Sequence, residues 1–218
     1  MAKADDFHVW FHPCTVRITL ANGVCGTGFL AAPGYVVTCE HVVREAGQGP
    51  ITLGWQGQEG FAQAELLRVL PDHDLALLGF RPPDQVPLPW VWLDADLQVG
   101  DRLYTFGYPE RDYDQGRPAT VEMEGFLEDS FLLLKQGQLQ PGMSGGPLLN
   151  QRTGKVCGMA KFTRDQFTDL GGGGVQGRVI LQQLPELREG QDAFEQGSQH
   201  WPGTSLGGDR PDPDPPLF

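Results

Sequence analysis

The stretch PGMSGGPLLN, residues 141–150, holds three glycines and one serine within five positions and then resumes an apolar run. Glycine loses the most backbone freedom on folding, so such a cluster indicates a backbone path that other residues do not follow. The apolar run after it is typical of a buried strand. The stretch therefore predicts a tight loop that presents Ser144 and leads directly into a strand.

The rest of the composition favours an all-β fold. The 218 residues include 30 glycines and 18 prolines, and short apolar runs alternate with Gly, Pro and Asp, which is typical of many short strands joined by turns. With 39% hydrophobic residues, the chain can bury one sizeable core or two small cores that share an interface. We expect strands over residues 15–20, 26–32, 35–39, 51–55, 64–70, 75–80, 90–93, 102–109, 125–135, 147–150, 155–162 and 178–184.

The C-terminal part differs from the β-rich part over residues 1–185. Residues 186–201 place apolar side chains at the spacing of one helical face, which predicts a short helix. Residues 202–218 are rich in Gly, Pro and Asp and are expected to form a disordered tail or a linker.

The charge balance argues against two classes of partner. A formal net charge of −12 repels a phosphate backbone and an anionic lipid surface, so we expect neither nucleic-acid nor membrane binding. The first residues, MAKADDFHVW, lack a basic stretch followed by an apolar one, and no apolar run of about 18 residues occurs. These features predict a cytoplasmic location.

The four cysteines, Cys14, Cys25, Cys39 and Cys157, lack the CxxC pairs that are typical of zinc sites. In a reducing compartment, we expect free and mostly buried thiols. A bridge between Cys25 and Cys39 is the alternative for an exported chain. We predict no metal site and no cofactor.

Two further motifs place polar residues at strand ends, as the opening stretch does with Ser144. YVVTCEHVV, residues 35–43, delivers His41 at the exit of a β-branched strand, and PDHDLALLGF, residues 71–80, puts Asp74 directly before an apolar run. Taken singly, the histidine is typical of a packed core residue and the aspartate of a turn. Together, the three occur in the order His, Asp, Ser.

With GTGFL before the histidine, TCEHVV around it, DLALL at the aspartate and GMSGGPLL at the serine, the sequence resembles the trypsin/chymotrypsin superfamily of serine peptidases. The resemblance implies a domain over residues 1–185 with two six-stranded antiparallel β-barrels, divided near residues 95–105, and a cleft between them. TCEHVV and YTFGYP are more similar to bacterial HtrA-related domains, and the C-terminal RVILQQLPELREGQDAF resembles modules of bacterial signalling or defence proteins.

The resemblance implies a serine endopeptidase that acts on a protein or peptide through an acyl-enzyme. Ser144 is the expected nucleophile, His41 its base, and Asp74 the group that orients the imidazole. The backbone N–H groups of Gly142 and Ser144 are expected to form the oxyanion hole. Because His41 acts unprotonated, we expect a neutral to mildly alkaline optimum. A catalytically silent fold, used as a binding or scaffold domain, is the alternative.

By the same resemblance, the substrate-binding residues are Gln138, Lys161, Phe162 and Thr163. Gln138 stands where trypsin carries an aspartate, so cleavage after Lys or Arg is not specified. Asp165 can restore negative charge, although a solvated loop acid is the simpler interpretation.

Three neighbouring features have alternative interpretations. Asp72 can replace Asp74 as the orienting group, although only Asp74 adjoins the apolar run. Cys39 shares a strand face with His41 and is expected to serve packing. His8, Trp10 and His12 can share a strand face and bind a metal, although a structural strand or a loose N-terminal arm is the commoner case.

Position 143 departs from the digestive enzymes of the superfamily. Met143 stands where those enzymes carry an aspartate that pairs with a new N-terminus after cleavage. We therefore expect no activation of that kind, and instead a regulatory partner or a downstream domain.

Overall fold

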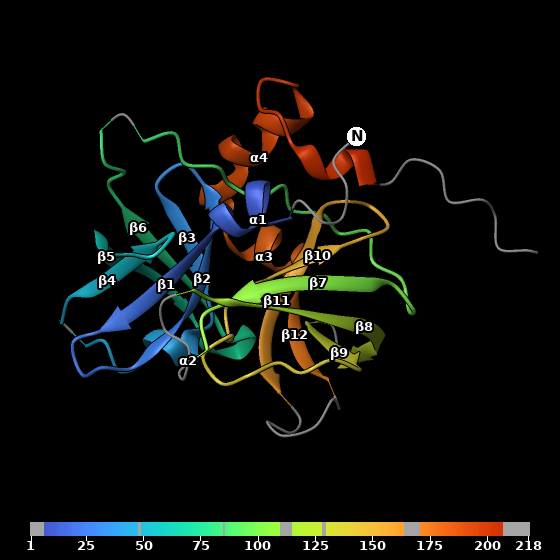
Figure 1. Cartoon of the computed structure of the whole chain (residues 1–218), viewed down its shortest axis with the longest axis horizontal. Coiled ribbons are helices and arrows are strands. Elements are labelled where there is room, and N and C mark those ends of the chain that lie inside the picture. The colour runs from blue at the N-terminus through green and yellow to red at the C-terminus, as the bar shows by residue number, and fades with distance from the viewer. Residues whose placement is uncertain are drawn as a thin grey trace, which may run out of the picture.

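The computed structural model describes residues 7–47, 49–84, 86–109, 115–127, 130–163 and 171–206. Their strands form two closed barrels, each with six antiparallel strands, which lie side by side (Figure 1). The expected all-β fold with two six-stranded barrels is therefore confirmed.

The first barrel is closed in the order β1-β2-β3-β6-β5-β4. In β1 the alternate residues Val16, Ile18 and Leu20 are buried, which is the period of two that a half-buried strand requires. The strands are β1 (Thr15–Leu20), β2 (Cys25–Ala32), β3 (Tyr35–Thr38), β4 (Ile51–Trp55), β5 (Gln58–Leu70) and β6 (Leu75–Phe80).

The second barrel is closed in the order β10-β11-β12-β9-β8-β7 and has its own small core, to which Leu103, Met123 and Leu148 belong. Its strands are β7 (Arg102–Gly107), β8 (Arg117–Leu127), β9 (Phe131–Lys135), β10 (Pro147–Asn150), β11 (Val156–Thr163) and β12 (Gly172–Gln176).

Short helices surround the barrels, and none of those in the described ranges is both long and apolar enough to cross a membrane. The α-helices are α1 (Phe7–Trp10), α2 (Glu40–Val43), α3 (Gly177–Gln183) and α4 (Arg188–Glu195). The 3-10 helices are η2 (His12–Cys14), η3 (Pro71–His73), η4 (Pro185–Leu187) and η5 (Pro202–Leu206).

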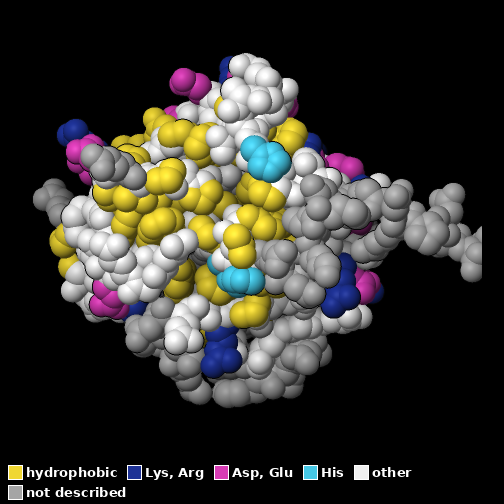
Figure 2. All heavy atoms as spheres, turned by 45° about the horizontal axis from the view of Figure 1, so that its top comes forward, with side chains coloured by type: hydrophobic (Ala, Val, Ile, Leu, Met, Phe, Trp, Pro, Cys, Tyr) yellow, Lys and Arg dark blue, Asp and Glu magenta, His cyan; other side chains and the backbone are white. Residues whose placement is uncertain are grey.

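Helix α4 connects the segment between the two barrels, at Val91 and Leu93, with strand β2 of the first barrel. The buried side chain of Gln191 accepts a hydrogen bond from Leu93 N (2.8 Å) and donates to Ala31 O (2.6 Å) and Val91 O (3.0 Å). The larger core accordingly runs from the first barrel through α3 and α4 into part of the second barrel. Figure 2 shows a face on which hydrophobic side chains occupy the middle and most charged ones lie toward the edge.

Four expected strands are wrong in type or bounds. Residues 178–184 fall mainly in helix α3, because Val179 and Ile180 are buried on one helical face. Residues 90–93 form only an isolated bridge, from Leu93 to Val156. Residues 125–135 belong to two strands, since β8 ends at Leu127 and pairs back onto β9. The expected strand over 64–70 is only the second part of β5, which begins at Gln58. Strand β12, in a region where we expected no strand, pairs with both β9 and β11.

Both ends of the chain also differ from expectation. The N-terminal segment is helical, not a strand, because Phe7 and Phe11 are buried together. His12 stacks on Phe106 with ring centroids 3.8 Å apart, and its Nε2 lies 2.6 Å from the hydroxyl oxygen of Tyr104. Burial, with a smaller contribution from His8, lowers the pKa of His12 to about 4. His12 is thus a packing residue and shares no strand face with His8.

The C-terminal helix α4 is shorter than the expected 186–201. Gly197 follows it with a φ of +70°, which is not a helical conformation. Trp201 is buried, and 202–206 form η5 rather than a disordered end. The remaining residues, 207–218, lie outside the described part of the chain.

All four cysteines are free, as expected, and the alternative bridge between Cys25 and Cys39 does not form. Cys14, Cys39 and Cys157 are buried, while Cys25 is half-buried. Burial raises the pKa of the Cys14 and Cys157 thiols.

Candidate active site

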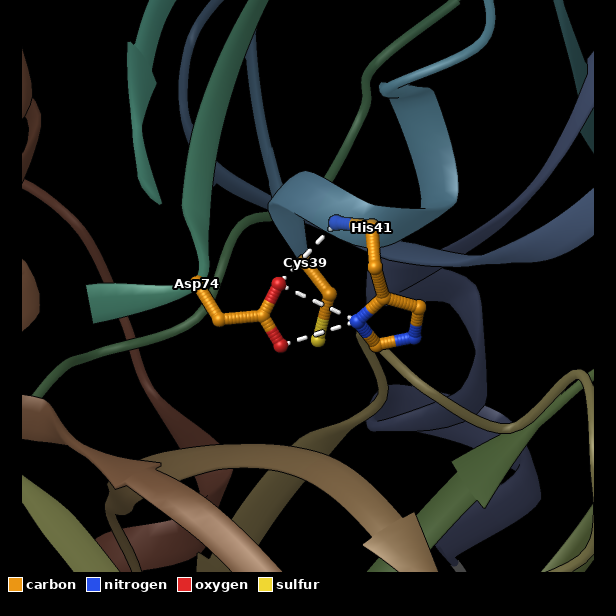
Figure 3. Close-up of side chains that lie close together, drawn as sticks. All are labelled: Cys39, His41 and Asp74. Carbon is orange, nitrogen blue, oxygen red and sulfur yellow. Dashed lines mark hydrogen bonds and ion pairs between the residues drawn. The ribbon is translucent and has the colours of Figure 1, made fainter. Parts of the chain in front are cut away.

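His41 and Asp74 come together at one end of the first barrel (Figure 3). Strand β3 leads through Cys39 into α2, whose second residue is His41. The backbone N–H of His41 donates to Asp74 Oδ1 at 2.9 Å, and the ring Nδ1 lies 2.8 Å from Oδ2 and 3.1 Å from Oδ1. A proton held on Nδ1 by the carboxylate leaves Nε2 free to accept one.

The Asp74 carboxylate is stabilised in its charged form. Burial would raise the pKa of this carboxyl, but hydrogen bonds from the ring and backbone of His41, together with the charge of Lys161, hold that pKa below its usual range. Asp74 takes a φ of +49° at the end of η3, which turns the chain into β6. Asp72, the alternative orienting group, is exposed, so the structure favours Asp74.

Ser144 follows a tight turn in the second barrel. Met143 N donates to Gln140 O at 3.0 Å, with Pro141 and Gly142 at the central positions and a φ of +92° at Gly142. Proline followed by a residue of positive φ is the signature of a type II turn. Gly145 has a φ of +94°, and a Cβ on it would lie 1.8 Å from Thr27 O. The opening stretch therefore needs glycine both for its turn and for its contact with the first barrel.

Thr27 of β2 anchors this loop, a role that we did not expect from the sequence. Its N–H donates to Ser144 O at 3.0 Å, and its hydroxyl donates to Gly142 O at 2.7 Å. The same hydroxyl oxygen accepts a hydrogen bond from Tyr108 N at 2.8 Å. The only signal in the sequence was its position within GTGFL.

One pocket, with a cavity volume of about 310 Å³, brings His41 and Ser144 together. The Ser144 hydroxyl donates to the main-chain oxygen of Lys161 at 2.8 Å. Because a hydroxyl has a single proton, it does not donate to His41 in this conformation. The pocket is lined by His41, Leu139, Gln140, Pro141, Met143, Ser144, Ala160 and Lys161.

Of the four expected substrate-binding residues, only Lys161 is among the described residues that line the pocket. Lys161 lines the pocket, whereas Gln138 is half-buried just before the lining residues Leu139 and Gln140. Phe162 and Thr163 continue strand β11, but their side chains lie outside the described part of the structure. Asp165 also lies outside the described residues.

Cys39 lies beside the His41–Asp74 pair (Figure 3), and the possible ligand atoms of the three residues all lie within 4.8 Å of one another. Burial, and then the negative charge of Asp74, raises the pKa of the Cys39 thiol well above its usual range. The thiol donates to Ala160 O at 3.4 Å, and the Lys161 ammonium lies 3.7 Å from Asp74 Oδ2. The burial of Cys39 and its hydrogen bond are typical of the packing role that we expected.

A second Ser–His pair lies nearby. Ser130 Oγ lies 3.0 Å from His73 Nδ1. In His41, by contrast, the corresponding nitrogen Nδ1 contacts Asp74. Neither residue lines the pocket of Ser144. The pair is a useful control for experiments on Ser144.

Comparison with known proteins shows the family to which the chain is similar. The family model described as "Trypsin-like peptidase domain" matches residues 26–159. "Probable periplasmic serine endoprotease DegP-like" of Chlamydia trachomatis serovar D is 32% identical over 155 residues, which cover 63% of this chain and 28% of that protein. The protein of the same name from Pseudomonas putida F1 is 33% identical over 148 residues, covering 64% and 30%. The chain thus spans less than a third of the length of these relatives.

Solved structures share the fold. The serine endoprotease from Yersinia pestis has a TM-score of 0.69 at 19% identity, over 87% of this chain and 68% of that one. Deg5 has a TM-score of 0.70 at 19% identity, over 86% and 96%.

The relatives also correct one expectation. They are named periplasmic endoproteases, which contradicts the cytoplasmic location that we inferred from the first residues. The resemblance to the superfamily and to its HtrA-related branch is confirmed. Because the family model spans residues 26–159, the chain belongs to the family of trypsin-like peptidase domains.

Proposed function

We propose that this chain is a serine endopeptidase domain that works through Ser144, His41 and Asp74. The observation that carries the proposal is the His41–Asp74 pair, with Nδ1 2.8 Å from the carboxylate, together with the fact that His41 and Ser144 line the same pocket. His41 Nε2 takes the hydroxyl proton while Ser144 Oγ attacks the peptide carbonyl, and the proton then passes to the leaving amine. Water next attacks the acyl carbon while His41 Nε2 takes its proton; the ester bond to Ser144 Oγ then breaks, the carboxylic acid leaves, and the proton returns to Oγ.

In this proposal, the backbone N–H groups of Gly142 and Ser144 donate hydrogen bonds to the oxyanion that forms during the attack. The type II turn at Gln140–Met143 and the Thr27 anchor support this assignment, because both hold the backbone of the loop in place. Loss of one such donor typically costs about 3 kcal/mol of transition-state stabilisation.

The second candidate is a catalytically silent fold that binds peptides or a partner. It is favoured by the orientation of the Ser144 hydroxyl, which donates to Lys161 O. A rotation about χ1 of Ser144 redirects that hydroxyl, and catalytic hydrogen bonds often form only with substrate present. We therefore rank this candidate second.

The biological role that we propose is that of a regulated effector module in a bacterial signalling or defence system. Met143 in place of the aspartate of zymogen-activated enzymes supports control by a partner or another domain. The DegP-like relatives, more than three times as long as the matched region, support the same arrangement.

Labelling with a fluorophosphonate probe, followed by peptide mass spectrometry, tests the chemistry. We expect one adduct, on Ser144, that is lost in Ser144→Ala and retained in Ser130→Ala, the matched change in the other Ser–His pair. No adduct on the wild-type protein, or an adduct that survives Ser144→Ala, would reject the proposed nucleophile.

A further inference from the structure

Lys161 contacts both halves of the proposed catalytic machinery. Its main-chain oxygen accepts the Ser144 hydroxyl at 2.8 Å, and its Nζ lies 3.7 Å from Asp74 Oδ2, the oxygen nearest to His41 Nδ1. The Lys161 side chain is only 25% exposed. The Asp74 carboxylate is thus shared between an imidazole from the first barrel and an ammonium from the second.

Aromatic packing holds the ammonium in this position. Nζ lies 4.1 Å from the centroid of the Phe131 ring at the start of β9. A cation over an aromatic face gains electrostatic attraction from the ring, more so when it is shielded from water. The ring and the carboxylate together fix a side chain that would otherwise be mobile.

The other charged groups around Asp74 do not duplicate this contact. Arg44, which follows α2, donates three hydrogen bonds to Glu40 and is largely exposed. In η3, Asp72 is exposed and His73 contacts Ser130. The Cys39 thiol also lies beside the pair, and burial, followed by the charge of Asp74, raises its pKa well above the usual range. Within the described part of the chain, Lys161 is therefore the cation in contact with the Asp74–His41 pair besides the imidazole itself.

We propose that Lys161 is a positioning residue that keeps His41 in its basic form at lower pH by sharing the Asp74 carboxylate. A protonated imidazole is stabilised by the carboxylate, and a fixed ammonium beside that carboxylate offsets part of the stabilisation. His41 consequently gives up its proton, and Ser144 becomes reactive, at a lower pH than in a site without the lysine. This inference rests on the proposed function, but it assigns to Lys161 an electrostatic task rather than contact with substrate.

The test is the pH dependence of fluorophosphonate labelling in the wild-type protein and in Lys161→Met. Methionine keeps an apolar stem and leaves the main-chain acceptor of Ser144 unchanged, so the variant removes mainly the charge. We expect the midpoint of the acidic limb to rise by about one pH unit, and the rate near pH 6 to fall by up to about tenfold. Lys161→Arg should keep the midpoint near that of the wild type.

Lys155→Met is the matched control. Lys155 Nζ lies 3.8 Å from the centroid of the Trp92 ring, so the control also removes a lysine from an aromatic face, but outside the pocket. We expect an unchanged midpoint. If the midpoint of the pH dependence in Lys161→Met stays at the wild-type value, the inference is overturned, whatever the change in KM for peptides. Lys161 would then remain only a substrate contact.

A readout without labelling separates this inference from the proposed function. NMR titration of the His41 ring in Ser144→Ala, with and without Lys161→Met, should show the same upward shift of the midpoint. If the wild-type protein takes no label at any pH, the peptidase proposal fails, while this titration still decides the role of Lys161. An unshifted titration would reject that role.

Discussion

The two barrels hold their parts of the site in different ways. The first barrel supplies His41 and Asp74, which are fixed by three contacts to one carboxylate group. The second barrel supplies Ser144 on a loop that is fixed by main-chain hydrogen bonds and by glycines. Side-chain chemistry therefore defines one half of the site, and backbone geometry defines the other.

The two halves meet through residues that serve both barrels. Thr27 belongs to the first barrel but anchors the Ser144 loop, and Lys161 belongs to the second barrel but contacts Asp74. Substitutions in the first half should thus affect the chemistry of proton transfer, and those in the second half should affect the path of the backbone.

Asp74→Asn should cause a large loss of activity that spares the fold. Asparagine keeps the shape but favours the wrong tautomer of His41, and kcat should fall by about 10⁴-fold in a peptidase assay. The exposed neighbour Asp72 provides the control, Asp72→Asn, for which we expect near wild-type activity. Equal losses in the two variants would mean that we have chosen the wrong carboxylate.

Gly145→Ala should distort the backbone of the Ser144 loop in the second barrel. A Cβ here would lie 1.8 Å from Thr27 O, and the φ of +94° disfavours any side chain. We expect the free energy of unfolding in urea to fall by about 3 kcal/mol or more, together with the labelling rate. Gly125, which has no atom within 4 Å of a built Cβ, is the control; Gly125→Ala should change stability by about 0.5 kcal/mol or less. Similar losses of stability in Gly145→Ala and Gly125→Ala would refute the claim that position 145 requires glycine.

Thr27→Val should loosen the contact between the halves. The change leaves the N–H of Tyr108 and the carbonyl of Gly142 without their buried partner, at a cost of about 1–3 kcal/mol in unfolding free energy. We expect the labelling rate to fall by about tenfold, since the oxyanion loop loses an anchor. Thr52→Val, on the exposed side of β4, should leave both quantities nearly unchanged. A fully active Thr27→Val protein would show that Thr27 does not hold the Ser144 loop in its active conformation.

Asp101→Asn should affect stability but not activity. Burial would raise the pKa of Asp101, but hydrogen bonds from Arg152, Gln98 N and Asn150 outweigh it and hold that pKa below its usual range. The carboxylate therefore stabilises the fold above its unfolded pKa of about 3.9, and this contribution disappears as pH falls below that value.

Urea unfolding at several pH values measures this effect. We expect the variant to lose about 2 kcal/mol at pH 7 and to show a weaker fall in stability below about pH 4. Identical pH dependence in the two proteins would contradict the ion-pair account.

The sequence predicted the parts of the site that short motifs encode. Asp74 directly precedes β6, while His41 and Ser144 lie close to the ends of β3 and β10, and strand ends are readable from local apolar patterns. The first barrel was accordingly predicted well except for β5, because its other strands are short apolar runs, whereas β5 is a long and mostly exposed strand.

The second barrel was harder to predict because tertiary contacts define its elements. Strand β12 begins with three glycines, which have no side-chain pattern, and it exists through its pairing with β9 and β11. The apolar run in α3 suits either a strand or a helix until its packing is known. The roles of Thr27 and Lys161 depend on contacts across the barrels, which local sequence does not encode.

The central claim is that His41 and Ser144 act as one unit, and a double-mutant cycle tests it most directly. The measurement is kcat for a fluorogenic peptide that the wild-type protein cleaves, in His41→Ala, Ser144→Ala and the double variant. We predict that each single change costs about 10⁶-fold and that the double variant is no slower than either single one. Losses that multiply in the double variant would show that the two residues act independently, and would contradict this account.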